Sequence, residues 1–145
     1  MKLPLKTTQK VGRRPTVHLP VYVLFTDTDE TAIALRAAAD LAQSLDAAIQ
    51  IIVTRVVPYP LPLTSPPIPV TFTEEQVAGI ARAAGVDVAV RVYDCRDREE
   101  TLAWLIPEHS VVVMSFKWHW YPTRQARLAR FLRREGHEVV LVDTK

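Results

Sequence analysis

Two hydrophobic patterns alternate along the chain: short apolar runs typical of buried strands, and longer stretches with apolar residues every three or four positions, typical of helices. The runs predict strands at residues 21–26, 49–57, 87–93, 110–116 and 138–143. The stretches between them predict helices at about residues 29–45, 73–84, 97–106 and 122–135. Regular β-α alternation with strands this apolar predicts a three-layer α/β fold, a doubly wound five-stranded parallel sheet.

Turn and capping residues mark where the expected helices begin and end. Thr73-Glu-Glu-Gln76 and Asp97-Arg-Glu-Glu100 match the capping box at a helix start. Gly85 and Gly136 stand where a helix commonly closes in a left-handed conformation. Residues 58–69 hold six prolines, which cannot join a sheet ladder. This loop is either a stiff surface connector or a lid or interaction segment.

Composition narrows the classes of function. The chain of 145 residues fits one domain over residues 21–145, preceded by residues 1–20, which we expect to be a flexible basic tail. That segment lacks the apolar core of a secretory signal, and no apolar run reaches the ~20 residues of a membrane span. A net charge of +2 does not indicate a nucleic-acid partner, and we expect none. The lone cysteine indicates a reducing compartment, so we expect a cytoplasmic protein.

The titratable side chains form no familiar catalytic or metal-binding pattern. Cys95 follows Asp94, whose carboxylate disfavours a thiolate, so we expect an inert thiol. His137, just after Gly136, is expected to interact with the end of the fourth helix. No metal-ligand spacing connects Cys95 with the histidines, which are His18, His109, His119 and His137. No nucleophile-elbow, Walker or His-Glu-x-x-His pattern occurs. We therefore expect a binding protein rather than an enzyme.

Segments along the chain together resemble the universal stress protein family. Glu30-Thr-Ala-Ile-Ala-Leu-Arg-Ala-Ala-Ala-Asp-Leu-Ala42 resembles the family's first helix. Asp97-Arg-Glu-Glu-Thr-Leu102 and Ser110-Val-Val-Val-Met-Ser115 resemble its third helix and fourth strand, and Glu138-Val-Val-Leu-Val142 its closing strand. The resemblance covers residues 21–142 and implies strand order 3-2-1-4-5. It also implies a homodimer paired through the last strand, and an apolar edge strand favours such pairing. The interface candidates are Val139, Val140, Leu141 and Val142.

Many members of this family bind ATP, and the resemblance places the parts of that site on this chain. The family's first strand ends in an aspartate with a Ser/Thr two positions later; here Thr26 and Thr28 stand there, with Asp27 between them. The family's glycine-rich loop after the fourth strand corresponds to residues 115–122, which hold no glycine. Its Gly-Ser/Thr pair aligns with Gln125-Ala126. Because glycines let backbone amides approach phosphates, we infer that the family's arrangement for binding the triphosphate of ATP is absent or replaced.

The aromatic segment Trp118-His-Trp-Tyr121 is the main candidate for ligand contact, since ligands of such sheets bind at the carboxyl ends of the strands. Its rings either stack on a base or fill the crevice. Lys117 or His119 is placed to meet a phosphate, and Arg124 begins the fourth helix beside the same crevice. The complete candidate set is Thr26, Asp27, Thr28, Val56, Ser115, Lys117, Trp118, His119 and Arg124.

Three functions remain open from the residues. The first is a binding or regulatory module that needs no cofactor and does not hold ATP in the family's way. The second is a nucleotide-binding protein, with ATP among its ligands, that stacks the base on the aromatic loop. The third is a receiver-like domain phosphorylated at Asp94; its remaining slots are filled by Asp27, Asp29, Ser115 and Lys145. A receiver continues into a fifth helix after that lysine, where this sequence ends.

Overall fold

The computed structural model describes residues 5–11, 19–26, 28–63, 68–117 and 123–143, which form six strands and four helices. The strands are β1 (Leu5–Val11), β2 (Val21–Leu24), β3 (Ile49–Val56), β4 (Val88–Cys95), β5 (Val111–Phe116) and β6 (Glu138–Asp143). The helices are α1 (Thr28–Leu45), α2 (Val70–Ala84), α3 (Arg98–Leu105) and α4 (Arg124–Arg134). None of these helices has the length and hydropathy needed to cross a membrane.

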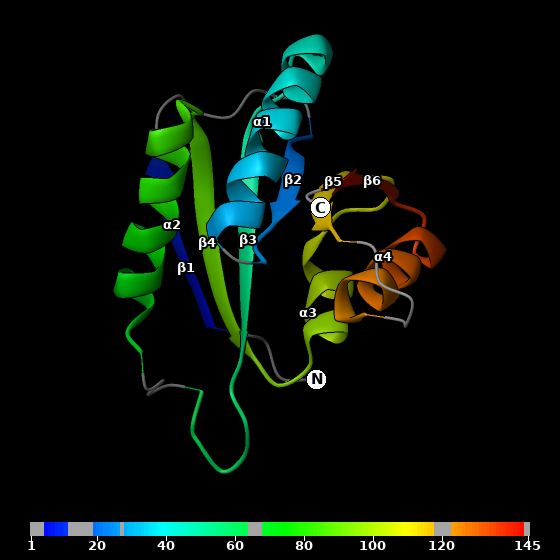
Figure 1. Cartoon of the computed structure of the whole chain (residues 1–145). Coiled ribbons are helices and arrows are strands. Elements are labelled where there is room, and N and C mark those ends of the chain that lie inside the picture. The colour runs from blue at the N-terminus through cyan, green and yellow to red at the C-terminus, as the bar shows by residue number, and fades with distance from the viewer. Residues whose placement is uncertain (1–4, 12–18, 27, 64–67, 118–122, 144–145) are drawn as a thin grey trace.

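All six strands join one sheet in the order β1-β4-β3-β2-β5-β6. Strands β2 to β6 run parallel to one another, and a helix lies in each connection between them (Figure 1). Counted along the chain, these five parallel strands have the order 3-2-1-4-5. The predicted doubly wound sheet and its strand order are therefore confirmed.

Strand β1 corrects the expectation of a flexible tail at residues 5–11; residues 1–4 and 12–18 of that segment lie outside the described residues. It pairs antiparallel with β4, from Leu5 opposite Asp94 to Val11 opposite Val88. The segment reads LKTTQKV. Its two lysines are typical of a basic tail, whereas its β-branched threonines favour a strand. Without β1, the backbone of β4 would be a bare sheet edge, and an added strand satisfies its amides and carbonyls. Lysines are common on such an edge strand because they discourage further pairing.

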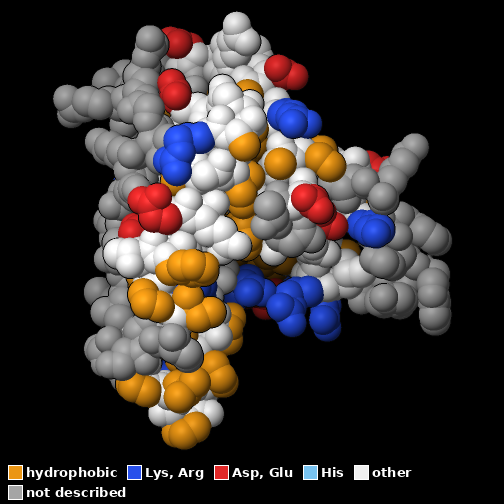
Figure 2. Space-filling view, turned by 60° about the vertical axis from the view of Figure 1, so that its left-hand side comes forward, with side chains coloured by type: hydrophobic (Ala, Val, Ile, Leu, Met, Phe, Trp, Pro, Cys, Tyr) orange, Lys and Arg blue, Asp and Glu red, His pale blue; other side chains and the backbone are white. Residues whose placement is uncertain are grey.

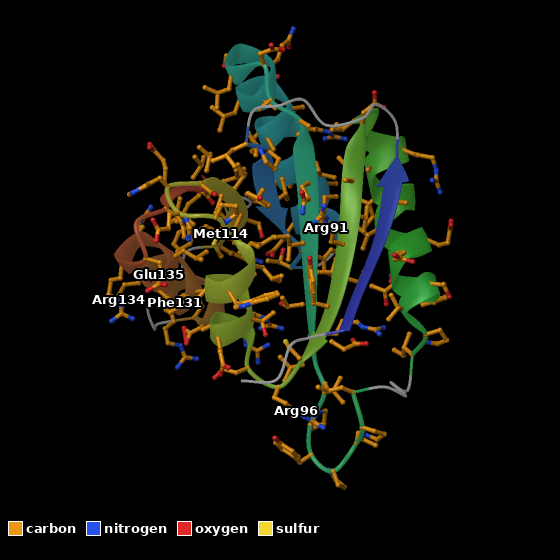
Figure 3. The ribbon with its side chains drawn as sticks, turned by 180° about the vertical axis from the view of Figure 1, so that it is seen from behind. Arg91, Arg96, Met114, Phe131, Arg134 and Glu135 are labelled. Atoms are coloured by element: carbon orange, nitrogen blue, oxygen red, sulfur yellow. The ribbon has the colours of Figure 1, made fainter. Side chains whose placement is uncertain are left out.

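Alternating side chains of the strands build two cores, one on each face of the sheet. On one face Val23, Ile51 and Val90 pack beneath α1 and α2. On the other, Tyr22 and Met114 belong to the core beneath α3 and α4. Figure 3 looks at this second face and shows α3 and α4 gathered on one side, with neither helix over β4 and β1. The space between α3, α4 and the ends of the central strands is where a crevice forms.

Of the four expected glycine and capping features, the Asp97 cap and the positive φ of Gly85 and Gly136 are confirmed, Gly136 having φ 94° after the α4 C-cap Glu135, and the Thr73 cap is wrong. The carboxylate of Asp97 caps α3 by accepting a hydrogen bond from the Glu100 backbone N–H at 3.0 Å. Gly85 ends α2 in the left-handed conformation, at φ 72°. Helix α2, however, begins at Val70 and not at Thr73. The Thr73 hydroxyl accepts from the Arg55 guanidinium at 2.9 Å, so this side chain serves a tertiary contact instead of a cap.

The side chain of His137 also differs from expectation. Its backbone N–H bonds the Leu132 carbonyl at the end of α4, but its Nδ1 accepts from the Ser110 backbone N–H at 3.3 Å. The ring is buried, and this burial lowers the pKa of His137. An imidazole that accepts at Nδ1 and resists protonation is suited to hold the start of β5 against the start of β6, rather than to neutralise a helix terminus.

The segment between β3 and α2 is an exposed apolar arm, described at residues 57–63 and 68–69. Figure 2 shows apolar side chains gathered at the foot of the molecule, where this arm projects. Tyr59 is 79% exposed and Phe72, in the first turn of α2, is 61% exposed. The Arg96 guanidinium lies 4.1 Å from the centre of the Tyr59 ring and donates to the Val57 carbonyl at 2.7 Å. These contacts fasten the base of the arm to the end of β4.

Candidate functional site

A cavity of about 400 Å³ opens at the carboxyl ends of β2 and β3, between α3 and α4. This volume lies within the range of about 300–1,000 Å³ that small-molecule sites occupy. Its apolar lining consists of Leu24, Phe25, Ile52, Leu102 and Leu128. Its polar lining consists of Thr26, Thr54, Arg98, Arg124 and Gln125. The cavity therefore combines an apolar floor with a basic, hydrogen-bonding rim.

Two arginines carry the charge of this rim, each as the first residue of a helix. The Nε atom of Arg98 donates to the Thr54 hydroxyl at 2.8 Å, which fixes the guanidinium over the end of β3. Burial, and then the positive charge of Arg124, lower the pKa of Arg98. Among the described residues no carboxylate forms an ion pair with either arginine. Arg98 is half-buried and Arg124 is exposed, and two cations at one cavity without a described carboxylate partner favour an anion between them.

A chain of polar side chains lies beside the cavity, where β2 and β5 adjoin. The Ser115 hydroxyl donates to Glu30 Oε2 at 3.2 Å, so the Thr26 hydroxyl is the donor in its 2.8 Å bond to Ser115. The Gln125 amide donates to the same Glu30 oxygen at 3.3 Å. The Thr26 backbone N–H donates to the Thr31 hydroxyl at 3.1 Å. These bonds connect β5, α1 and α4 with Thr26, two residues after the end of β2.

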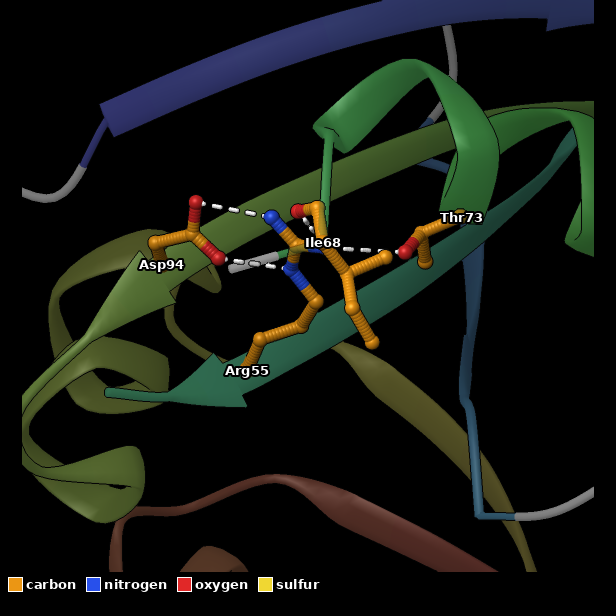
Figure 4. A network of polar contacts seen from close by, with 4 residues as sticks. All are labelled: Arg55, Ile68, Thr73 and Asp94. Atoms are coloured by element: carbon orange, nitrogen blue, oxygen red, sulfur yellow. Dashed lines mark hydrogen bonds and ion pairs between the residues drawn. The ribbon is translucent and has the colours of Figure 1, made fainter. Parts of the chain in front are cut away.

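Asp94 lies on the opposite face of the sheet and is fully buried, and Figure 4 shows its carboxylate facing the guanidinium of Arg55. Its two carboxylate oxygens accept from Arg55, from Nε at 2.6 Å and from Nη2 at 2.9 Å. The remaining nitrogen of Arg55, Nη1, donates to the Ile68 carbonyl at 2.8 Å and to the Thr73 hydroxyl at 2.9 Å. Thr54 lines the cavity and Arg55 faces the other way, as neighbours on a strand do. Asp94 thus belongs to a buried ion pair between β3 and β4, in which both carboxylate oxygens accept from Arg55.

The structure brings together some of the nine residues predicted for ligand binding. Thr26 and Arg124 line the cavity, and buried Ser115 lies behind Thr26. Lys117 follows β5 as an exposed side chain. Val56 ends β3 with 46% of its surface exposed and is not part of the cavity wall. Four predictions concern side chains outside the described residues: Asp27, Thr28, Trp118 and His119.

Sequence reasoning missed Arg98, Thr54 and Gln125 as cavity residues, and Glu30 as their neighbour. Arg98 was seen only as part of a capping box. Its place as the first residue of a helix that follows the carboxyl end of a strand was the available signal. Gln125 was noted only because it stands where a glycine was expected. Its contact with Glu30 joins residues 95 positions apart, which the sequence does not reveal.

Cys95 is 3% exposed, and burial raises the pKa of its thiol, which suits the inert role expected of it.

Strand β6 forms one edge of the sheet. Val139 and Leu141 pack toward the core under α4, while Val140 and Val142 pack toward the core under α1. The side chains proposed for an interface therefore already serve the two cores, and what β6 offers a partner is its backbone edge.

Together, the sheet order and the crevice define a doubly wound α/β protein with its site at the carboxyl edge. Three solved structures are similar to this chain in fold over most of its length. The universal stress protein from Archaeoglobus fulgidus in complex with dAMP has a TM-score of 0.60 at 14% identity, over 88% of this chain and 99% of that one. The second, a universal stress protein from Archaeoglobus fulgidus, has a TM-score of 0.63 at 12% identity, over 87% and 94%. A universal stress protein in complex with cAMP has a TM-score of 0.53 at 17% identity, over 87% and 98%.

The chain therefore has the universal stress protein fold, as its resemblance to that family implied. Identities this low show the fold alone. No family model matches the chain, and no curated protein matches it.

Proposed function

We propose that this protein is a non-catalytic binding module whose crevice holds a small anionic ligand of the nucleoside monophosphate class. The observation that carries the proposal is the pair Arg98 and Arg124, two cations without a described carboxylate partner on the rim of one cavity. A phosphate monoester would accept hydrogen bonds from both guanidinium groups. The apolar floor suits the flat face of a base.

The lining supports binding rather than catalysis. Its polar members are two threonines, two arginines and a glutamine, none of which is a ready general base or nucleophile. Side chains bind the phosphate, because no glycine occurs between Gly85 and Gly136 that would let backbone amides approach it. This is the sense in which the protein departs from the usual ATP site of the family.

The ligands named for two solved structures of this fold agree with a monophosphate. One holds dAMP and the other holds cAMP, and each carries a single phosphate. The alternative in which a base stacks on the aromatic segment uses Trp118, which lies outside the described residues. A Trp118→Ala variant distinguishes the two: loss of binding in that variant favours stacking on the aromatic segment.

The test is calorimetric titration with AMP, dAMP, cAMP, ATP and adenosine. We expect the monophosphates to bind and adenosine to bind more weakly, because it has no anion for the arginines. Arg98→Gln and Arg124→Gln should each weaken AMP binding about tenfold or more, since a hydrogen bond between charged groups contributes about 1.5–3 kcal/mol. Arg127→Gln is the matched control, because Arg127 is an exposed arginine of the same helix that does not line the cavity. No AMP binding, or an equal loss in the control, contradicts the proposal.

We also propose that the protein forms a homodimer through the edge of β6. Support comes from the position of β6 at the end of the sheet, where one side of its backbone is an edge. Backbone pairing of two β6 edges would satisfy groups that a monomer leaves to water. Sedimentation velocity at micromolar concentration should give the mass of a dimer, and Leu141→Pro, which removes a backbone donor from the strand, should shift it toward the monomer. A monomer for the wild type contradicts this.

A further inference from the structure

The carboxylate of Glu30 lies at a point in the sheet where an anionic ligand would be expected. Strand β2 lies between β3 and β5, and the strand order reverses there. In doubly wound sheets, ligands bind at this switch point, outside the carboxyl ends of the strands. The first turn of α4 also reaches this point, because Gln125 bonds Glu30 of α1. A helix N-terminus carries partial positive charge and favours an anion.

Glu30 takes the hydrogen-bond donors that converge on this point. Its Oε2 atom accepts from the Ser115 hydroxyl at 3.2 Å and from the Gln125 amide at 3.3 Å. Thr26, which bonds Ser115, and Gln125 itself both line the cavity. The carboxylate is thus one side chain away from the cavity, on the side toward β5. The protein supplies its own anion at the switch point, while the cations Arg98 and Arg124 remain at the cavity.

We propose that Glu30 is a specificity-determining residue that excludes polyphosphates from the crevice. A single phosphate bound by Arg98 and Arg124 remains on the basic rim. A longer anionic chain that extends toward the switch point meets a negative charge in a partly desolvated site and finds Ser115 and Gln125 already engaged. Discrimination between one phosphate and three then comes from repulsion as well as from the lost glycine loop. This inference rests on the proposed function, in which the crevice holds a monophosphate. The hydrogen bonds of Glu30 with Ser115 and Gln125 do not depend on that function.

The test compares calorimetric affinities for AMP, ATP and inorganic tripolyphosphate in Glu30→Gln and the wild type. A glutamine removes the charge, and its carbonyl oxygen can still accept from Ser115 and Gln125, so the network persists. Glu30→Ala is the second variant, and the melting temperature reports whether each variant is folded. Glu99→Gln is the matched control, since it removes the same charge from an exposed site in the first turn of α3.

We expect Glu30→Gln to raise the affinity for ATP relative to AMP about tenfold, equivalent to about 1.4 kcal/mol. Glu30→Ala should show the same direction, and Glu99→Gln should leave the ratio unchanged. The proposal is overturned if the ratio in Glu30→Gln equals that in Glu99→Gln, or if the wild type binds ATP as tightly as AMP. If the wild type binds no nucleotide, the proposed function fails, and the role of Glu30 is then tested with tripolyphosphate alone. A higher affinity for tripolyphosphate in Glu30→Gln than in the wild type supports that role, and an unchanged affinity refutes it.

Discussion

Replacing Asp94 by alanine should destabilise the protein strongly, because the change leaves a charge without its counterion inside the fold. The Asp94 side chain is 0% exposed and the Arg55 side chain 17% exposed. Asp94→Ala removes both bonds between the carboxylate and Arg55. Among the described residues, it leaves the guanidinium with the Ile68 carbonyl and the Thr73 hydroxyl as partners. An uncompensated cation near the ends of β3 and β4 is the source of the expected loss.

Removing one partner of a buried ion pair costs about 3–5 kcal/mol. Arg55 keeps two hydrogen bonds and some contact with water, so the lower end of that range applies, about 3 kcal/mol. For a chain of this length the melting temperature should fall by roughly 6–12 °C. The exposed pair of Arg82 and Glu75, 3.8 Å apart with side chains 56% and 65% exposed, provides the comparison. Arg82→Gln should cost less than about 1 kcal/mol.

Urea denaturation of the wild type, Asp94→Ala and Arg82→Gln measures these free energies of unfolding. A further Arg55→Met change in the Asp94→Ala protein should restore part of the loss, because it removes the unpaired charge. If Asp94→Ala unfolds at the same urea concentration as Arg82→Gln, the ion pair does not hold these strands together and the reasoning is wrong. Treatment with acetyl phosphate bears on the same residue: a phosphate adduct lost in Asp94→Asn would restore the receiver hypothesis.

Two further predictions concern stability. Burial lowers the pKa of His137 in the folded protein, so the folded state resists a proton that the unfolded chain accepts near pH 6.5. The contribution of His137 to stability is therefore complete above pH ~6.5 and is lost as the pH falls below that value. Between pH 7.5 and 5, the free energy of unfolding measured with urea should fall more for the wild type than for His137→Asn. An equal fall in the two proteins would contradict the assignment. Gly85→Ala should lower the free energy of unfolding by about 1 kcal/mol because φ is 72° there, whereas Gly79→Ala, inside α2 with nothing within 4 Å of an added Cβ, should raise it by about 0.5–1 kcal/mol. Thermal melts of the two variants should move in opposite directions, and shifts of the same sign would refute the pair.

The parallel sheet was predictable because its strands are continuous apolar runs and its helices carry one apolar stripe each. Strand β1 escaped prediction for the opposite reason: LKTTQKV has apolar residues only at its ends, and its pairing depends on an open edge at β4 that the sequence does not display. The same limit explains Thr73. A capping box is a local pattern, and a guanidinium from another strand took the hydroxyl.

The candidate site was predictable in position but not in composition. The carboxyl ends of the strands follow from the topology, so Thr26 and Arg124 were found. Asp94 also ends a strand, and only the register with β3 reveals that Arg55 lies directly opposite. Arg98 and Glu30 derive their importance from partners far away in the chain, and such contacts require the folded structure.

The central claim, that side-chain cations rather than backbone amides hold a phosphate in this crevice, is tested most directly by a crystal structure with AMP. The account predicts the phosphate within hydrogen-bond distance of the Arg98 and Arg124 guanidinium groups, with the base over Leu24 and Ile52. A phosphate held by main-chain amides of residues 116–126, or bound outside this cavity, would contradict it.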